Sequence, residues 1–185
     1  MNIYIHMGTH KTATTSIQKF CFDNLNILNQ NGLDYIRMRE NGRHTELNQC
    51  VLRDEVAKFT HPHIIPIKDS MNEKMKIFIE NFIKNSKFEN ILFSDEGLDY
   101  IRYHHELKKL IELFPKESNI IPILCIREIH DWKNSWIEYL KKTQKNTSDK
   151  NSPYYPTEKS WIFEIDKLLN LLNENFKHVI KIDYN

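Results

Sequence analysis

The stretch that decides the fold is residues 2–16, which read Asn-Ile-Tyr-Ile-His-Met-Gly-Thr-His-Lys-Thr-Ala-Thr-Thr-Ser. Its first part, 2–7, is a short run of β-forming residues that stops at Gly8, which indicates a strand ending in a loop. From Thr14 onward, apolar residues recur at helical spacing until the Asn-Gly pair at 31–32, a sequence typical of a helix C-terminus. The opening unit is therefore predicted to be a strand, a loop of the size that binds a phosphate, and a helix.

The rest of the chain continues this alternation. Each predicted strand is almost entirely apolar, which is typical of parallel strands covered on both faces. We therefore predict an α/β fold, a three-layer αβα arrangement around a central parallel sheet, in one domain over residues 1–185. Ligands in such sheets bind beyond the carboxyl ends of the strands. The further strands are expected at 33–38, 90–94, 119–126 and 178–182, and the further helices at 46–59, 72–85, 106–114, 131–143 and 157–176, with a polar loop at 145–156.

The composition limits the classes of partner. The 26 Lys and Arg residues nearly balance the 25 Asp and Glu residues, giving a net charge of +1, so no global field favours nucleic acid and any anion site must be local. The three cysteines, Cys21, Cys50 and Cys125, are scattered, which favours neither a disulfide framework nor a zinc site and indicates a reducing cytoplasm. No apolar run approaches the ~20 residues of a transmembrane helix, and no secretory signal is seen.

The loop after the first strand carries the clearest chemical signal. Gly8 allows a tight turn, the amides at the start of the next helix point at the loop, and Lys11 adds a mobile cation. A nucleoside-triphosphate loop requires GxxxxGK[ST], and this pattern fails because Ala13 and Thr14 occupy the GK positions. The alternative is that the hydroxyls at 14–16 cap a helix and that Lys11 is a solvated lysine. The candidate binding residues are Gly8, Thr9, His10, Lys11, Thr12, Ala13, Thr14, Thr15 and Ser16.

The position of the lysine, three residues after Gly8, resembles the loop of the PAPS-dependent sulfotransferase family, which reads approximately GxxKxGTTS (PAPS is 3′-phosphoadenosine 5′-phosphosulfate). Lys11 and residues 14–16 fall on its key positions. Ala13 replaces the usual second glycine, which requires a negative φ at this position or a small conformational cost. The resemblance implies a P-loop-like fold, PAPS as the sulfuryl donor, the desulfated nucleotide PAP as the product, and no metal.

A second motif follows the strand predicted at 119–126. Arg127 leaves this strand, Asp131 is expected to cap the next helix, and Ser135 is expected in its first turn or so. A guanidinium and a hydroxyl at this spacing can converge on one phosphate. In the family, an arginine and a serine so spaced bind the 3′-phosphate of PAPS. The alternatives are an ion pair of Arg127 with Asp131 or Glu128, and a serine on the helix surface.

Transfer of a sulfuryl group needs stabilisation of the departing phosphate and a base that takes the acceptor's proton. The resemblance assigns the first role to Lys11. The leading candidate for the base is Glu96, because bacterial and carbohydrate-type members place a glutamate after the corresponding strand. His44 is the second candidate, since an unperturbed histidine has a pKa near ~6.5. The alternatives are that Glu96 only starts a helix and that His44 is a surface residue.

The acceptor is expected to be a small molecule or a carbohydrate, bound by the segments 38–70 and 145–159. The family usually has a basic, glycine-containing loop beyond the last strand, and this sequence ends right after its predicted last strand, so we expect a sulfotransferase-like domain without that loop. Two other functions stay open. The pair Asp95 and Glu96 after an apolar strand imitates the acidic pair of a kinase or NTPase, and a protein of this fold can also bind PAP or PAPS without catalysis.

Overall fold

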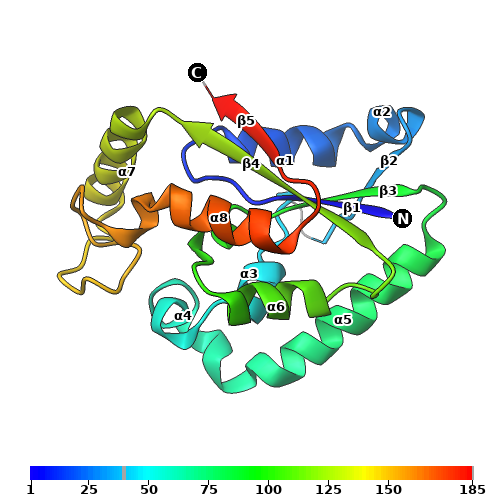
Figure 1. The fold of residues 1–185 in the computed structure, drawn as a ribbon, viewed down its shortest axis with the longest axis horizontal. Helices are drawn as coiled ribbons and strands as arrows, with labels where there is room; N and C mark the ends of the chain where they lie inside the picture. Colours follow the sequence, from blue (N-terminus) through cyan, green and yellow to red (C-terminus); the bar gives the residue numbers. More distant parts are fainter. Residues whose placement is uncertain (39–40, 185) are drawn as a thin grey trace.

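The computed structural model describes residues 1–38 and 41–184 and contains a five-stranded, all-parallel sheet in the order β2-β3-β1-β4-β5 (Figure 1). The chain leaves the central strand β1 for one edge of the sheet and later crosses to the other side. The strand order therefore switches at the carboxyl ends of β1, β3 and β4, which is where α/β sheets bind ligands. The strands are β1 (Asn2–His6), β2 (Leu33–Tyr35), β3 (Asn90–Ser94), β4 (Asn119–Arg127) and β5 (Ile180–Tyr184).

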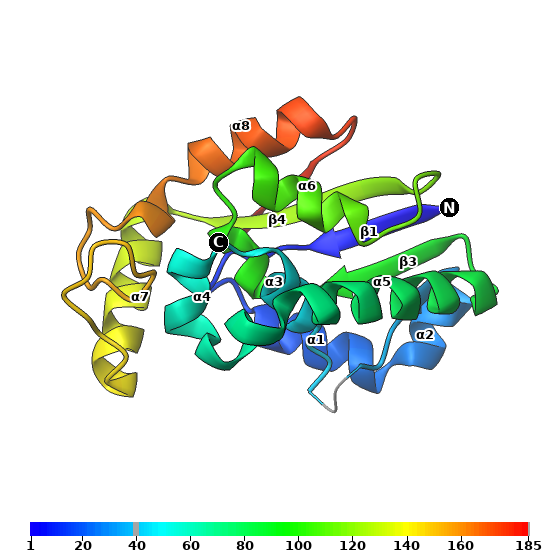
Figure 2. The same ribbon diagram turned by 90° about the horizontal axis from the view of Figure 1, so that it is seen from below.

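Helices cover both faces of this sheet, which confirms the predicted three-layer αβα fold. The helices α1 (Thr14–Asp23) and α2 (Leu25–Gln30) lie on one face (Figures 1 and 2). The opposite face carries α3 (Glu46–Val51), α4 (Asp54–Thr60), α5 (Lys68–Asn85), α6 (His104–Glu112) and α8 (Ile165–Asn175), while α7 (Ile129–Thr143) stands at the end of the sheet. Three short 3₁₀ helices, η1 (Pro62–Ile67), η2 (Glu96–Tyr100) and η3 (Trp161–Phe163), join these elements.

The side chains of the strands alternate between the two faces. In β1, Ile3 and Ile5 are fully buried in the main core beneath the larger group of helices, and Phe93 of β3 joins them there. Tyr4 and Leu92 point the other way, toward α1 and α2. This period of two is the strand periodicity, and it shows why β1 and β3, which are covered on both faces, are mostly apolar.

Two predicted long helices are each interrupted, and a third, expected at 157–176, is an α-helix only from Ile165 onward, with η3 before it. The helix expected from Thr14 to the pair at 31–32 breaks at Asn24, where both the backbone N–H and the side-chain amide donate to the Phe20 carbonyl, at 3.0 and 2.9 Å. The helix expected at 46–59 splits before Asp54. There the backbone N–H of Arg53 donates to the buried carboxylate of Glu106 at 2.9 Å, an interaction with a residue far along the chain.

The start of α7 also differs from the prediction. The helix begins at Ile129, and its cap is Glu128, whose side chain accepts a hydrogen bond from the backbone N–H of Asp131 at 3.0 Å. The assignment of Asp131 as the cap was wrong, because the helix begins two residues before Asp131 and the Glu128 side chain satisfies one of its first free amides. Ser135 consequently lies in the second turn of α7.

Two predictions about the whole chain concern disulfides and membrane-spanning helices. Cys21, Cys50 and Cys125 are all buried, and none forms a disulfide. Within residues 1–38 and 41–184, no helix combines the length and the apolar character that crossing a membrane requires.

His44 lies in the core rather than on the surface. Its Nδ1 accepts a hydrogen bond from the backbone N–H of Ser94 at 2.7 Å, and its Nε2 donates to the Ile36 carbonyl at 2.7 Å. The ring therefore sits between the end of β3 and the segment after β2, with both nitrogens engaged. Burial lowers the pKa of His44 to about 4, although the bond to Ile36 opposes this shift. This position gives His44 a structural role and argues against its use as the catalytic base.

The buried His44 predicts a specific loss of stability in acid. Its folded pKa of about 4 lies below its ordinary value of 6.5, so the unfolded chain takes up the proton first. The contribution of His44 is fully present above pH 6.5 and falls by about 1.4 kcal/mol per pH unit as the pH drops toward 4. His44→Gln keeps a donor and an acceptor but does not titrate, so its free energy of unfolding should fall less between pH 6.5 and 5.

Urea unfolding of both proteins across this range measures the difference. His178→Gln, a change at an exposed histidine, is the control and should follow the wild type. Parallel stability curves for the wild type and His44→Gln would contradict the prediction.

Candidate functional site

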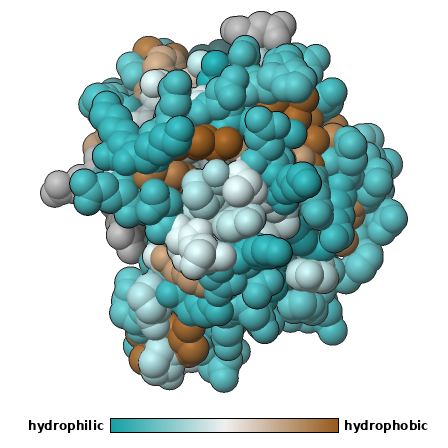
Figure 3. All heavy atoms as spheres, turned by 90° about the vertical axis from the view of Figure 1, so that its left-hand side faces the viewer, coloured by the Kyte–Doolittle hydropathy of each residue, from teal (hydrophilic) through white to brown (hydrophobic). Residues whose placement is uncertain are grey.

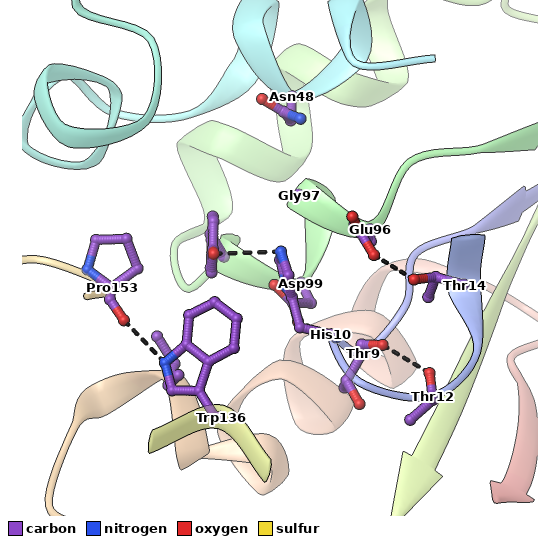
Figure 4. Close-up of polar contacts among 12 residues, drawn as sticks. Thr9, His10, Thr12, Thr14, Asn48, Glu96, Gly97, Asp99, Trp136 and Pro153 are labelled. Carbon is purple, nitrogen blue, oxygen red and sulfur yellow. Dashed lines mark hydrogen bonds and ion pairs between the residues drawn. The ribbon is translucent and has the colours of Figure 1, made fainter. Parts of the chain in front are cut away.

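The loop that follows β1 is bound to the backbone of β4. The Cys125 N–H donates to the Gly8 carbonyl at 2.6 Å, and the Cys125 carbonyl accepts from the backbone N–H of Thr9 at 2.9 Å and from its hydroxyl at 3.0 Å. The hydroxyl of Thr12 donates to the Thr9 carbonyl at 2.6 Å (Figure 4). The hydroxyls of Thr9 and Thr12 therefore hold the loop in shape, and what these residues offer a ligand is their backbone.

The backbone of the loop forms a concave surface for an anion. Lys11 and Ala13 have left-handed φ angles of 66° and 57°, and Thr12 between them does not. Alternation of this kind turns successive N–H groups toward one point. Among the described residues, no acceptor binds the amides at 11–13, and the N-terminus of α1 follows directly. Ala13 thus adopts a positive φ, and of the two outcomes predicted for this alanine, the conformational cost is the one that applies.

Two cations flank this surface. The Nζ of Lys11 lies 5.1 Å from the ring centre of Tyr139, and no carboxylate in the described part of the chain lies within ion-pair distance of it. Arg127, the last residue of β4, donates to the Lys11 carbonyl at 3.5 Å, and its guanidinium lies 5.9 Å from the ring centre of Tyr184. Arg127 forms no ion pair with Glu128 or Asp131, so the alternative explanation given for this arginine is not seen. Both cations remain available to an anion at the loop.

The serine and threonine hydroxyls that were predicted to bind the ligand differ in their surroundings. Ser135 is half-buried on α7, and no hydrogen bond joins it to Arg127 or to the loop within residues 1–38 and 41–184. Ser16 is exposed, and Thr15 accepts a hydrogen bond from the Arg43 guanidinium at 2.9 Å. The convergence of Arg127 and Ser135 on one phosphate therefore stays a prediction.

Glu96 stands directly against the loop. Its carboxylate accepts a hydrogen bond from the hydroxyl of Thr14, the first residue of α1 (Figure 4). It also pairs with Arg43 at 3.4 Å. Burial alone would raise the pKa of Glu96, but the charge of His10, the bond from Thr14 and the charge of Arg43 outweigh it and lower the pKa. Glu96 is therefore a carboxylate at neutral pH, the form that a proton acceptor needs.

His10 connects the loop to the 3₁₀ helix η2. Its backbone N–H and its Nδ1 both contact the buried Asp99 carboxylate, at 2.9 and 2.8 Å. Its ring stacks on Tyr100 at 4.7 Å and meets the edge of Trp136 at 5.0 Å (Figure 4). Burial alone would lower the pKa of His10, but Asp99 together with Glu96 raises it. The sequence placed His10 in the loop, but its partner Asp99 carried no signal that a single sequence could show.

Asp95 and Glu96 are neighbours with different surroundings. Asp95 accepts hydrogen bonds from the backbone N–H of Asn48 at 2.8 Å, from its side-chain amide at 2.9 Å and from the Gly97 N–H at 3.0 Å. Burial raises the pKa of Asp95 to about 7, although these three donors oppose the shift. A side chain at position 97 would collide with the Asn48 amide, so Gly97 lets α3 approach η2. The oxygens of Asp95 are thus occupied by the protein's own donors.

A cavity of about 190 Å³ opens beside Glu96. Its aromatic lining is Tyr100, Trp136, Tyr139 and Tyr154, and the Trp136 indole N–H is fixed by the Pro153 carbonyl at 3.2 Å. The face that carries α7 shows a central group of side chains of intermediate hydropathy between hydrophilic margins (Figure 3). The cavity is a small, polar and aromatic chamber next to the loop.

Both segments predicted to hold an acceptor reach this cavity. Arg43, Asn48 and His61 come from the segment 38–70, and Lys145 and Tyr154 come from 145–159. Residues 39 and 40 of the first segment, and the terminal residue 185, lie outside the described residues.

The sequence reading missed Gln18 and Arg43, although each left a trace in the sequence. Gln18 is a polar residue on the buried face of α1, four positions after Thr14 and three before Cys21. Arg43 directly precedes His44, which was singled out. A search for polar residues on apolar helix faces would have found Gln18, whereas Arg43 needed the fold to bring it to Glu96.

Comparisons with known proteins add little to this geometry. No protein-family model and no curated protein matches the chain. A solved structure from a study of the PezAT chromosomal toxin-antitoxin system of Streptococcus pneumoniae is similar at 14% sequence identity and a TM-score of 0.49. The match covers 98% of this chain and 67% of the other. A likeness of this degree says nothing about activity, so the functional argument rests on the site itself.

The left-handed Ala13 gives the first prediction for the site. Ala13→Gly removes the Cβ clash of that conformation and should raise the free energy of unfolding by about 0.5–1 kcal/mol, after the greater freedom of glycine in the unfolded chain is subtracted. The matched control is Ala57→Gly in α4, where glycine should instead lower it by about 1 kcal/mol or more. Chemical unfolding measures both. A loss of stability in Ala13→Gly would show that the alanine conformation is unstrained.

Proposed function

We propose that the protein is a sulfotransferase that moves the sulfuryl group of PAPS to a hydroxyl or amine acceptor. The observation that carries the proposal is the concave loop with unpaired amides, with Lys11 and Arg127 at its sides and the Glu96 carboxylate beside its helix. An anion site and a proton acceptor are thereby adjacent, at the carboxyl ends of the central strands. This is the arrangement that the resemblance to the family leads one to expect.

The residues present fit a phosphosulfate nucleotide. The free amides at 11–13, the start of α1 and Lys11 supply donors for the 5′-phosphosulfate. Arg127 is the group that would distinguish a 3′-phosphate, with Ser135 as its proposed partner. PAPS, when bound, supplies an activated sulfuryl group. The whole loop from Gly8 to Ser16 belongs to the proposed binding site, with Thr9 and Thr12 acting through the shape they maintain.

The chain's own groups can carry out the transfer without a metal. Lys11 would neutralise the charge that develops on the departing phosphate as the bond from sulfur to the phosphate oxygen breaks. Glu96 would take the proton of the acceptor as the new sulfur–oxygen or sulfur–nitrogen bond forms. Thr14 and Arg43 position Glu96, and the contact of Thr14 with Glu96 links the base to the first turn of the helix that holds the anion.

The proposal also covers the location of the protein in the cell and the molecules that it acts on. We propose a cytoplasmic protein, which the three buried, unpaired cysteines support. The near balance of charges supports a small-molecule or carbohydrate acceptor rather than nucleic acid. The kinase or NTPase alternative gains little from Asp95, because Asn48 and Gly97 already occupy its oxygens.

The binding half of the proposal predicts a thermal shift. PAP should raise the melting temperature without magnesium, and it should do so more strongly than ADP, which lacks the 3′-phosphate. Lys11→Ala and Arg127→Ala should each reduce the PAP shift, because each removes a charge-assisted contact to an anion. Arg127→Ala should bring PAP and ADP close to each other. The controls are Lys19→Ala and Arg37→Ala, which change exposed cations away from the loop.

Equal shifts by PAP and ADP in the wild-type protein would contradict the assignment of Arg127 and Ser135 to the 3′-phosphate. A shift that requires ATP with magnesium would instead support the kinase or NTPase alternative.

The catalytic half predicts that Glu96→Gln nearly abolishes turnover while PAP still binds. Loss of a positioned base lowers rates by typically ~10²–10⁴-fold. Transfer of labelled sulfate from PAPS to a panel of hydroxyl and amine acceptors measures it, and Glu138→Gln, an exposed change on α7, is the control. Full turnover in Glu96→Gln would remove Glu96 as the base. PAP binding without transfer to any acceptor by the wild type would favour the non-catalytic alternative.

A further inference from the structure

We infer that the cavity beside Glu96 binds a small, uncharged molecule with several hydroxyl groups, and that Gln18 and Asn48 are the residues that select it. This inference rests on the proposed function, because it identifies the acceptor of that reaction. Its evidence is separate from the anion-binding loop and consists of polar atoms in the cavity wall that the protein itself leaves without partners.

Gln18 is the main observation. Its side chain is 1% exposed, yet neither its amide nitrogen nor its amide oxygen has a hydrogen-bond partner among the described residues, and it lines the cavity. Buried polar groups are almost always paired, and each unpaired one costs about 1–3 kcal/mol. A glutamine kept at this position of α1 therefore requires an explanation, and a ligand in the cavity that completes its hydrogen bonds provides one.

Two further unpaired atoms belong to the same cavity wall. The side-chain oxygen of Asn48 and the Nε of Arg43 are buried without a partner, although the other polar atoms of these two side chains are engaged. Asn48 projects from α3 on the far side of Gly97 from the Glu96–Thr14 contact (Figure 4). The unpaired atoms thus come from three separate segments, 18, 43 and 48, and they comprise two donors and two acceptors.

The chemistry of these atoms identifies the ligand class. A hydroxyl both donates and accepts, as does a carboxamide, so hydroxyl groups can pair with Gln18 and Asn48 at once. A protonated amine would instead need a free carboxylate, but both carboxylates in the cavity wall are engaged, Asp95 by Asn48 and Glu96 by Thr14. A carboxylate ligand would face these two acidic side chains as well as Arg43 and Lys145, so the formal charges of the wall cancel and give an anion no net attraction. Neutral hydroxyl groups are the class that remains.

The size and the remaining walls of the cavity limit the ligand further. At about 190 Å³ the cavity is smaller than the ~300–1,000 Å³ that drug-sized ligands occupy. The rings of Tyr139 and Tyr154 stack on the buried Trp136 at 5.3 and 6.4 Å, and these two half-buried tyrosines provide the flat aromatic wall that a ligand can meet. A ring with apolar faces and a hydroxylated rim, such as one sugar unit, matches a flat wall on one side and unpaired amides on the other.

The test uses Gln18→Leu, which removes the amide and keeps a side chain of similar reach. If the amide serves a ligand, its removal relieves an unpaired buried group, so the variant without ligand should melt at a higher temperature than the wild type. A glutamine with a structural role would give the opposite result. Gln30→Leu, at an exposed position of α2, is the matched control and should leave the melting temperature nearly unchanged.

Ligand binding is measured by saturation-transfer NMR on the PAP-saturated protein. The probes are the methyl glycosides of glucose, galactose and mannose, with glucosamine as a charged amine and phenol as a single-hydroxyl ring. At least one glycoside should bind to the wild type, and Gln18→Leu should weaken it about tenfold, the effect of losing hydrogen bonds to neutral groups. Gln18→Glu, which keeps the size but replaces a donor with a charge, should weaken it as well, and Gln30→Leu should not.

Several results would overturn the inference: binding of phenol or glucosamine but of no glycoside, binding of no probe at all, or equal glycoside binding by the wild type and Gln18→Leu. These results are separate from a failure of the proposed function. If PAP gives no thermal shift, the sulfotransferase proposal fails, and the glycoside titration of the protein without PAP still tests the cavity.

Discussion

The site depends on the way β4 holds the loop that follows β1. Cys125 pairs through its N–H and its carbonyl with Gly8 and Thr9, so the loop is an extension of the sheet rather than a free connection. This constraint fixes the direction in which α1 starts, and with it the positions of Thr14 and Gln18. Because Glu96 follows the neighbouring strand β3, its distance from the loop is set by the same sheet. The anion surface, the carboxylate and the cavity are therefore placed by one set of backbone hydrogen bonds.

The pair of acidic residues after β3 shows how the fold separates two similar groups. Asp95 turns toward α3 and serves as its anchor, while Glu96 turns toward the loop and stays ionised. Their pKa values move in opposite directions, to about 7 for Asp95 and below the ordinary value for Glu96. Environments that push two carboxyl groups apart in this way are a recurrent means of giving neighbouring acids different roles. The separation here follows from η2, whose first turn points the two side chains to different sides.

Much of the fold could be predicted because apolar runs alternate with helical patterns, and β3 and β4 are each followed by an acidic residue. Residues 90–94 were placed without error, since Asp95 ends an uninterrupted apolar run. One misplaced boundary, the break before Asp54, is decided by a contact remote in sequence, because Arg53 binds Glu106 there. Periodicity along one segment carries no information about such a partner.

The candidate site likewise contains some residues that the local sequence predicts and others that depend on contacts remote in the chain. The loop and Glu96 are read from local sequence, because a strand, a turn and a helix start are local events. His44 was misjudged because a polar stretch around it suggested a surface, while its two main-chain partners at Ile36 and Ser94 are contributed by the folded sheet. Asp99 became visible only as the partner of His10, a contact that spans 89 positions of the chain.

The left-handed residues of the loop have a consequence for the speed of binding. Lys11 and Ala13 hold conformations that a free chain seldom visits, and the hydrogen bonds to Cys125 and between the threonines maintain them. Under the proposed function, a loop already held in this shape needs no rearrangement before the anion enters. The association rate of the proposed nucleotide would then be governed by diffusion and by the charges of Lys11 and Arg127, and changes within the loop would act mainly on its residence time.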